Sequence, residues 1–350
     1  MRLVVIVGAG ASLAEAISFR PKRTRFHPPV DASFFAKAME LEADVARLRR
    51  ASLAAGLRNP FDEPRPRMEE FFGDAYYELI EASPNSLEAY RALLRSYTRT
   101  IVDTTSWFHM RGDGVLSRIL RQILLIEDLE QLTFITFNHD LVLENVLIEH
   151  RRRQRWCVER GYGPIQLTFG GSNRAVSKMP RHDDEVCDHS IPIEILKLHG
   201  SLNWRVTTRG HEPSLKDLFP SKDGKRMICV TDRTPPVTLT RTSKGRAWDL
   251  LPQIVPPVYG KQSLIDSRFS DLWSHAGAAL READRLIVIG YSMPVTDVHT
   301  EKLLSRSIRS NQLMKDIEVI NPDPSSAERF ANISQVDRVM WTRRVDSFQG

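Results

Sequence analysis

Four apolar segments, each followed directly by small or polar residues, constrain the fold of this chain most strongly. They lie at residues 3–7, 133–137, 194–198 and 285–289. A strand that is buried on both faces is apolar along its length, and in a parallel sheet it delivers a functional loop at its carboxyl end. The four segments therefore predict a parallel sheet whose loops gather along one edge.

The last third of the chain alternates helical and extended patterns. The expected elements are a helix over 263–283, a helix over 297–310, a strand over 316–320, a helix over 324–332 and a short strand at 338–341. This alternation is typical of the α/β class. We expect a Rossmann-like parallel sheet flanked by helices.

A long helical pattern follows the first strand. It covers residues 31–130, where Leu87, Tyr90, Leu94 and Tyr97 fall on one helical face. We interpret this stretch as a large helical insertion into the α/β core.

Two further stretches, 151–194 and 205–260, are polar and rich in turn residues, with one strand expected at 227–231. We interpret both as irregular insertions. Together with the strands around them they predict a single domain over residues 1–350.

The cysteines restrict the chemistry. Cys157, Cys187 and Cys229 are far apart and form no Cys-x-x-Cys pair. This excludes a four-cysteine zinc site and argues against a disulfide framework, so we expect no metal and a reducing, cytoplasmic location. The longest apolar runs, about five residues, fall far short of the roughly 20 needed to span a bilayer.

The charge is modest, +5, but arginines are locally dense at 20–25, 47–50 and 151–155. Two interpretations remain open. Solvated helix ends and loops are the favoured one, and a patch that meets nucleic acid or an acidic partner is the other. Nucleic acid is therefore not predicted for the isolated chain.

The turn after the first strand is rich in glycine. Gly8, Ala9, Gly10 and Ser12 follow the strand and open the next helix, where the backbone can approach a pyrophosphate and free N–H groups can bind it. The motif is incomplete as a dinucleotide fingerprint. By itself it leaves a plain strand-turn and a nucleotide contact equally open.

Polar side chains follow the next two strands. The Asn138 amide can accept a hydrogen bond from water or a ribose hydroxyl and donate another. His199, at a strand end before a glycine, is placed to act as a base near neutral pH rather than as a core histidine. For Asp140, orienting a neighbour and capping the following helix are equally good explanations.

The last strands end in residues that suit ribose hydroxyls and phosphates. These are Gly290, Ser292 and Asn321. Helix capping is the competing explanation, and for Asp297 and Asp323 it is as good as a functional one.

Together these segments resemble the sirtuin family in its broad sense. Residues 8–12 match its GAG-x-S loop, and 136–140 look like its T-Q-N-x-D motif with Phe137 in place of glutamine. Leu198-His199-Gly200 is similar to the segment with the catalytic histidine, Gly290 begins the counterpart of G-T-S, and Asn321 stands where an asparagine contacts the adenosine ribose.

The departures from the sirtuin deacylases are also informative. The chain cannot supply their four-cysteine zinc domain, and Leu13-Ala14-Glu15 replaces the G-I-x-D-F-R segment. The helical insertion and the segments at 254–257 and 290–297 resemble divergent sirtuin-like proteins of bacterial antiphage systems. Those proteins hydrolyse NAD during infection, several of them in large assemblies or beside a HerA-type ATPase.

The resemblance implies an NAD hydrolase that cleaves the nicotinamide–ribose bond and depletes NAD in antiphage defence. It implies NAD as substrate, a homo-oligomer and a HerA-type ATPase or other defence protein as partner. Asn138 and His199 would be catalytic. The residues implied in binding are Gly8, Ala9, Gly10, Ser12, Asp140, Gly290, Ser292 and Asn321.

Three alternatives stay open. The chain could be an NAD-dependent protein deacylase, an ADP-ribosyltransferase, or a non-catalytic nucleotide- or DNA-binding subunit of an assembly. The intact Asn138 and His199 argue against a purely passive role.

Overall fold

The structure, a computed structural model, describes residues 1–19, 21–105, 114–149, 156–170, 178–179, 191–206, 227–243, 245–256, 269–294, 297–334, 336 and 338–343. Several sequence predictions lie outside these ranges: the beginning of the expected helix at 263–283, the arginines at 151–155, Arg20 and Cys187. Within the described ranges, no helix is both long and apolar enough to cross a bilayer.

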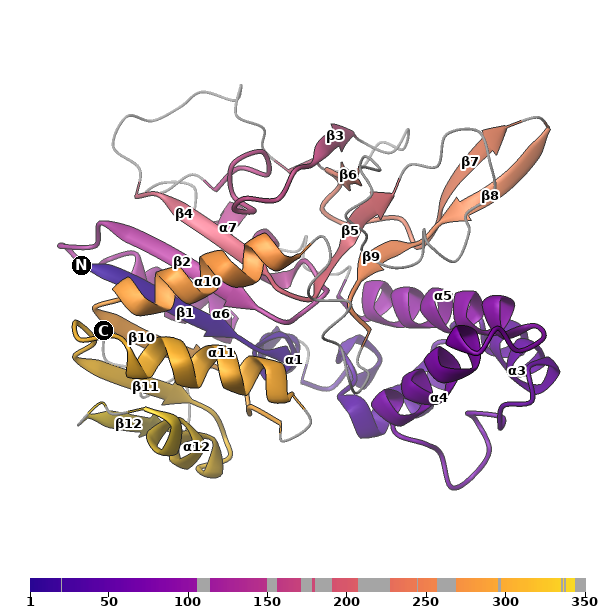
Figure 1. Ribbon diagram of the computed structural model, residues 1–350, viewed down its shortest axis with the longest axis horizontal. Helices are drawn as coiled ribbons and strands as arrows, with labels where there is room; N and C mark the ends of the chain where they lie inside the picture. The colour runs from indigo at the N-terminus through magenta and orange to yellow at the C-terminus, as the bar shows by residue number, and fades with distance from the viewer. Residues whose placement is uncertain are drawn as a thin grey trace.

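A six-stranded parallel sheet forms the centre of the molecule (Figure 1). Its strands are β1 (Arg2–Val7), β2 (Gln131–Thr136), β4 (Ile193–Lys197), β10 (Arg285–Ile289), β11 (Asp316–Ile320) and β12 (Val339–Thr342). They are ordered β12-β11-β10-β1-β2-β4. If the six strands are numbered 1 to 6 along the chain, this order is 6-5-4-1-2-3, which is the Rossmann arrangement. The strand order therefore reverses between the neighbouring strands β1 and β10. The predicted fold class is confirmed.

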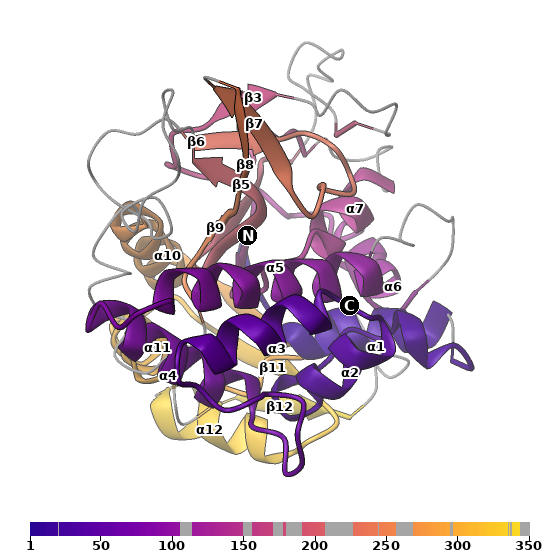
Figure 2. The ribbon, with the colours of Figure 1, turned by 90° about the vertical axis from the view of Figure 1, so that its right-hand side faces the viewer.

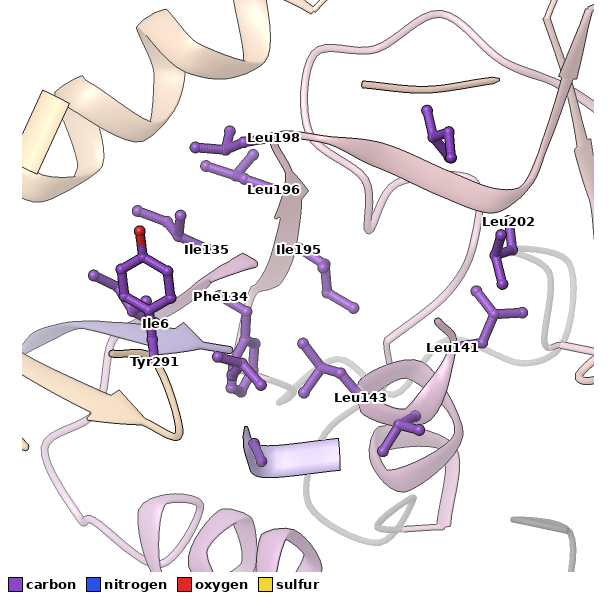
Figure 3. Packing of buried hydrophobic residues seen from close by; sticks show 14 of the residues in the cluster. Ile6, Phe134, Ile135, Leu141, Leu143, Ile195, Leu196, Leu198, Leu202 and Tyr291 are labelled. Atoms are coloured by element: carbon purple, nitrogen blue, oxygen red, sulfur yellow. The ribbon is translucent and has the colours of Figure 1, made fainter. Parts of the chain in front are cut away.

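The strands are apolar because helices cover both faces of the sheet. Helices α10 (Ser270–Glu282) and α11 (Val298–Arg309) cross the near face in Figure 1, and α6 (Val115–Ile123) and α7 (Val142–Glu149) lie behind it. Central residues such as Ile6 and Phe134 are fully buried (Figure 3). Burial on both faces removes the alternation of an amphipathic strand, which is why continuous apolar runs marked these strands.

A group of helices separates β1 from β2. It comprises α1 (Ala9–Phe19), the short η1 (Thr24–Phe26) and η2 (Asp31–Ser33), α2 (Phe34–Glu40), α3 (Val45–Ala54), α4 (Met68–Ile80), α5 (Ser86–Thr105) and α6. Tyr90, Leu94 and Tyr97 are buried on α5, as their spacing predicted. Figures 1 and 2 show α2–α5 packed together beyond the carboxyl ends of the strands, and we use the term helical insertion for α2–α5 from here on.

A buried carboxylate joins α1 to α6. Glu15 accepts hydrogen bonds from the backbone N–H of Leu116 and from the Ser117 hydroxyl, at 3.1 Å for the latter. Burial raises the pKa of this carboxyl above its usual value, and the hydrogen bonds oppose that rise. Since these donors lie in the first turn of α6, Glu15 satisfies the amino terminus of that helix from another helix.

A second, smaller sheet is built from strands on both sides of β4 in the sequence. It contains β3 (Thr168–Gly170), β5 (Gly200–Val206), β6 (Met227–Val230) and β9 (Pro252–Ile254) in the order β3-β6-β5-β9, beside a hairpin of β7 (Leu239–Ser243) and β8 (Arg246–Leu250). The strand expected at 227–231 is present as β6. The other strands within 205–260 were not predicted.

Two of the strands that were not predicted, β5 and β7, contain several polar residues. Arg205 is fully buried in β5, where its guanidinium donates to the carbonyl oxygens of Leu250 (2.9 Å) and Pro236 (2.8 Å). Burial lowers the pKa of Arg205 to about 9. The sequence of β7, Leu-Thr-Arg-Thr-Ser, is likewise short and polar. β5 alternates Leu202, Trp204 and Val206 with polar residues, a strand pattern that the prediction overlooked, whereas β7 shows no such alternation.

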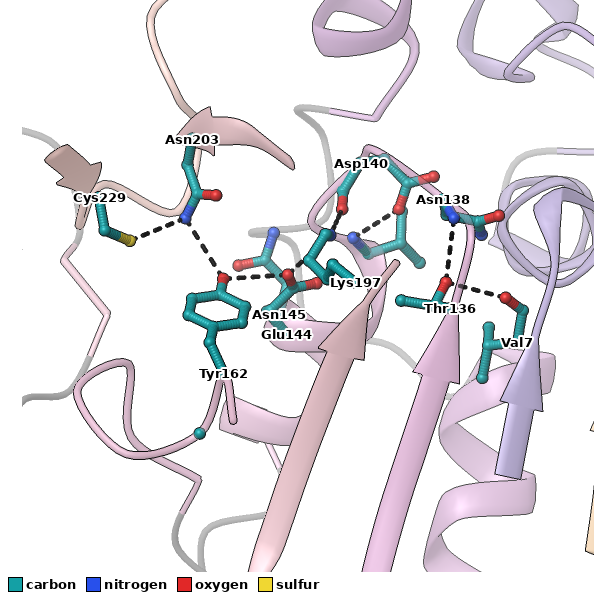
Figure 4. A network of polar contacts seen from close by, with 12 residues as sticks. Val7, Thr136, Asn138, Asp140, Glu144, Asn145, Tyr162, Lys197, Asn203 and Cys229 are labelled. Atoms are coloured by element: carbon teal, nitrogen blue, oxygen red, sulfur yellow. Dashed lines mark hydrogen bonds and ion pairs between the residues drawn. The ribbon is translucent and has the colours of Figure 1, made fainter. Parts of the chain in front are cut away.

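A buried ion pair fixes β4 to α7. The Lys197 ammonium lies 2.9 Å from the Glu144 carboxylate and also donates to the carbonyl of Asp140; both charged side chains are at most 1% exposed. The Tyr162 hydroxyl donates to the same carboxylate oxygen at 3.0 Å, and Asn203 donates to that hydroxyl (Figure 4). The network therefore connects the large sheet to the small one.

We expect Lys197→Met to lower the free energy of unfolding by about 3–5 kcal/mol, because it leaves the buried Glu144 carboxylate without its counter-ion. Lys302→Met, on the exposed face of α11, is the matched control and should change stability by less than about 0.5 kcal/mol. Urea denaturation of both variants measures the difference. Equal stability of the two would contradict the role given to the pair.

Candidate functional site

The turn after β1 packs directly on the turn after β10, at the point where the strand order reverses. The Gly8 N–H donates to the Ile289 carbonyl at 2.9 Å, and the Gly10 N–H donates to the Gly290 carbonyl at 3.0 Å. A Cβ on Gly8 would lie 2.5 Å from the Gly290 oxygen, and one on Gly290, whose φ is +61°, would lie 2.2 Å from the Ala11 nitrogen. The glycines are therefore required by the contact between the two turns.

This contact leaves the beginning of α1 facing outward. Ala9, the first residue of the helix, is exposed, and Gly10 is partly exposed. The amino terminus of a helix carries unsatisfied N–H groups and the positive end of the helix dipole, which together attract an anion. The exposed helix start can therefore bind a phosphate without any side chain.

A hydrogen-bond network holds Asn138 at the end of β2. Its side-chain amide donates to Ser12 Oγ at 3.2 Å, and Ser12 in turn donates to Asp140 Oδ2 at 3.0 Å. Its backbone N–H donates to Thr136 Oγ1 at 3.1 Å, and that hydroxyl donates to the Val7 carbonyl at 2.8 Å. Asn138 remains partly exposed while Ser12 is buried, so Ser12 positions the amide from behind.

Asp140 is fully engaged within the protein. One oxygen accepts the Ser12 hydroxyl, and the other accepts the Val142 N–H at 2.9 Å in the first turn of α7. The capping explanation is thus the one that the contacts show for Asp140. Through Ser12 the same carboxylate also supports Asn138.

His199 lies in the turn between β4 and β5. Gly200, with φ of +81°, makes this turn, and a Cβ there would be 2.3 Å from the Gln253 oxygen. Thr136 pairs with Lys197 in the parallel register, so Asn138 and His199 each lie two residues beyond that pair on neighbouring strands. The structure therefore brings these two predicted site residues to the same edge and the same height.

Aromatic side chains surround His199. Its ring centre is 5.1 Å from that of Phe137 and 6.0 Å from that of Trp273, and Phe137 stacks on Tyr291 at 4.8 Å. Phe137 is partly exposed, whereas His199 is 7% exposed. Phe137 thus replaces the glutamine of the sirtuin pattern by an apolar wall next to the histidine.

The other side of the switch point carries Ser292 and Asn321. Ser292 is exposed, and its carbonyl accepts a hydrogen bond from the Arg329 guanidinium. Asn321 Oδ1 accepts the Asp323 N–H at 3.0 Å. Nothing in the sequence pattern indicated Arg329, which holds the loop after β10 from α12 (Ser325–Ile333).

The two aspartates left open by the sequence differ. Asp323 caps α12, accepting the N–H and the hydroxyl of Ser325 at 3.0 and 2.7 Å, and these bonds lower the pKa of its carboxyl. Asp297 makes no side-chain cap to α11 and accepts the Tyr291 hydroxyl at 3.4 Å. Burial, reinforced by the Asp297 charge, raises the pKa of Tyr291 well above its usual value.

Sequence reasoning also missed a contact from the helical insertion. The Tyr97 hydroxyl of α5 lies 2.7 Å from His139 Nδ1. Tyr97 was assigned only to an apolar face, and a buried hydroxyl leaves no trace in that spacing.

A groove of about 570 Å³ lies at the opposite, amino edge of the sheet. Ion pairs cross it, including Arg2–Glu282 and Arg285–Asp316, at 2.7 and 2.8 Å. Ligands of open α/β sheets bind outside the carboxyl ends of the strands, so this groove is not the candidate site. Among the residues placed by the structure, no group of three or more His, Cys, Asp or Glu side chains could hold a metal ion.

Comparison with protein families and with curated proteins finds no match. Among solved structures, the chain is similar to a Sir2 homologue mutant in complex with 2′-O-acetyl ADP ribose, at 15% identity and a TM-score of 0.41 over 97% of this chain and 85% of that one. It is also similar to a Sir2 homologue mutant in complex with ADP ribose, at 15% identity and a TM-score of 0.39 over 95% and 84%. A structure on sirtuin substrate affinity matches at 14% identity and a TM-score of 0.39 over 97% and 88%. The fold class therefore rests on the strand order of the large sheet and not on these similarities.

We expect Gly290→Ala to destabilise the fold more than Gly56→Ala. Both glycines have positive φ, which costs an alanine about 1–2 kcal/mol. Only at Gly290 would the methyl also meet backbone atoms, adding about 1–3 kcal/mol of overpacking, since no atom lies within 4 Å of the corresponding position on Gly56. Thermal and urea unfolding measure the difference. Equal stability of the two variants would contradict the close packing between the turns after β1 and β10.

Proposed function

We propose that this protein hydrolyses NAD at the carboxyl edge of the sheet, releasing nicotinamide and ADP-ribose. The observation that carries the proposal is the arrangement at the switch point. An exposed helix start, an amide fixed by Ser12 and a histidine next to it lie on adjacent strand ends. This combination suits an anionic dinucleotide whose sugar must be attacked by water.

The proposed orientation follows from the strand order. The amino terminus of α1 at Ala9 would hold the pyrophosphate, and Ser292 and Asn321, after β10 and β11, would face the adenosine half. Asn138 and His199, after β2 and β4, would then face the nicotinamide ribose. In this proposal Gly8, Gly10 and Gly290 shape the edge, and Ser12 with Asp140 positions Asn138 rather than touching the substrate.

The chemistry requires little acid catalysis, because nicotinamide leaves as a neutral molecule when the electrons of its bond to ribose return to the ring nitrogen. Water forms the new bond to the ribose carbon, and its proton must be removed. His199 would accept that proton, and Asn138 would orient the water or a ribose hydroxyl. The balance is NAD and water to nicotinamide, ADP-ribose and a proton.

The remaining alternatives make different products. A deacylase would form an acylated ADP-ribose only in the presence of an acyl-lysine peptide, and a transferase would modify a protein. A non-catalytic subunit would turn over no NAD and would bind DNA in a salt-sensitive way. Of the arginines at 47–50, Arg47 is paired with Glu88 at 2.7 Å, whereas Arg49 and Arg50 are exposed on α3.

From the sequence resemblance we infer a role in antiphage defence by NAD depletion, in a homo-oligomer or together with a HerA-type ATPase. Infection of cells that carry the protein, with and without the product of its neighbouring gene, tests this inference. A fall in cellular NAD that requires His199 is expected, whereas constant NAD during a protective response would contradict it.

We predict that Asn138→Ala and His199→Ala each reduce nicotinamide release at least about 100-fold, because each removes a group that acts on the reacting water or sugar. His275→Ala, an exposed histidine of α10 that pairs with Glu194, is the control and should retain the parent rate. Chromatography of the products from purified protein, alone and with its genetic neighbour, measures the rates. Parent rates in either site variant would rule out the proposed roles.

A further inference from the structure

A hydrogen bond connects the helical insertion to the candidate site. Tyr97 of α5 and His139 are both buried, at 6% and 7% exposure, and the Tyr97 hydroxyl lies 2.7 Å from His139 Nδ1. Their rings meet edge to face, with centres 5.6 Å apart. His139 stands between Asn138 and Asp140, so this bond holds the loop that carries the proposed catalytic amide.

The direction of the bond follows from its surroundings. Burial, reinforced by the charge of Asp140, raises the pKa of the Tyr97 hydroxyl, which therefore keeps its proton. In the part of the chain that the structure describes, this hydroxyl makes no other hydrogen bond. A buried hydroxyl proton needs an acceptor, so Tyr97 donates to Nδ1, and a neutral His139 ring then carries its own proton on Nε2.

A second imidazole lies close by. The ring centres of His139 and His199 are 6.3 Å apart. Among the described residues, the ionisable groups near His139 include Tyr97 from α5, His199 after β4 and Asp140 in its own loop. Lys197 is bound to the Asp140 carbonyl and paired with Glu144 of α7. Protonation of His139 at Nδ1 would break the hydrogen bond that Tyr97 donates to that nitrogen. The positive charge on His139 would then disfavour protonation of His199.

We propose that Tyr97 holds His139 in the neutral form with its proton on Nε2, so that His199 is the histidine of this edge that takes up a proton near neutral pH. The proposal rests on the proposed function for its consequence, but not for the state of His139 itself. Tyr97 and His139 are then positioning residues.

The same bond gives the helical insertion control over the site. Tyr97 packs on Phe34 of α2 and Phe72 of α4, with ring centres 5.6 Å away in both cases. A shift of α5 against these helices, on assembly or on binding a partner, would break the bond to His139. The site would then carry two titrating imidazoles instead of one.

Tyr97→Phe tests the proposal, because it removes the hydroxyl and keeps the ring. Tyr90→Phe is the matched control: Tyr90 is fully buried on the same helix and, like Tyr97, packs on Phe72. Long-range ¹H–¹⁵N spectra of histidine-labelled protein report the ring tautomer, and His139→Gln assigns the signal. We expect Nε2-protonated, neutral His139 in the parent and in Tyr90→Phe, and a mixed or charged ring in Tyr97→Phe at the same pH.

The same samples give a second readout. In Tyr97→Phe the two rings should titrate as a coupled pair separated by about 1–2 pH units, and the acid limb of kcat/KM for NAD should show two steps instead of one. Binding of ADP-ribose, measured by calorimetry, should stay within about twofold of the parent. An Nδ1 proton on parent His139, or a Tyr97→Phe spectrum identical to that of Tyr90→Phe, would overturn the proposal.

The spectra need no substrate, so they test the state of His139 separately from the proposed NAD hydrolysis. If the parent bound no ADP-ribose and turned over no NAD, the proposed function would fail while the tautomer result still decided the state of His139. If NAD were hydrolysed normally and the tautomer did not depend on Tyr97, only the proposed pair would fail.

Discussion

The backbone contact between the turn after β1 and the turn after β10 is the constraint on which the rest of the site depends. Gly10 and Gly290 approach so closely that neither tolerates a side chain. This contact fixes where α1 begins, and α1 carries both the exposed Ala9 and the buried Ser12. The contact between the two turns therefore positions both the start of α1 and, through Ser12, the Asn138 amide. The packing of the two turns therefore requires these glycines whether or not a ligand binds.

Buried hydrogen bonds support the loop at 138–140, at the carboxyl edge of the large sheet. Asp140 caps α7 and accepts the Ser12 hydroxyl, and the Asp140 carbonyl accepts the Lys197 ammonium from β4. Tyr162 carries this network on to Asn203 of the small sheet (Figure 4). Buried polar groups of this kind are costly unless they are satisfied, and satisfied networks define one geometry. The insertion adds Tyr97 from a third direction, so three parts of the fold converge on the loop at 138–140.

The sequence predicted the large sheet well because its strands are buried on both faces. Residues 285–289 and 316–320 were placed at their observed bounds for that reason. In the small sheet it predicted β6 but missed β5, although Leu202, Trp204 and Val206 alternate with polar residues there. It also missed the hairpin, where β7 is short and polar. For the candidate site, the positions of Asn138 and His199 after strand ends made them candidates, and the strand register places them at the same edge. Tyr97 and Lys197 could not be found, because their roles come from contacts across more than forty residues of sequence.

The account is tested most directly by the crystal structure of the protein with ADP-ribose. It predicts pyrophosphate density at the amino terminus of α1 beside Ala9, and the ribose that had carried nicotinamide between Asn138 and His199. Adenosine should lie toward Ser292 and Asn321. Density for the ligand in the groove at the amino edge, beside Arg2 and Asp284, would contradict it.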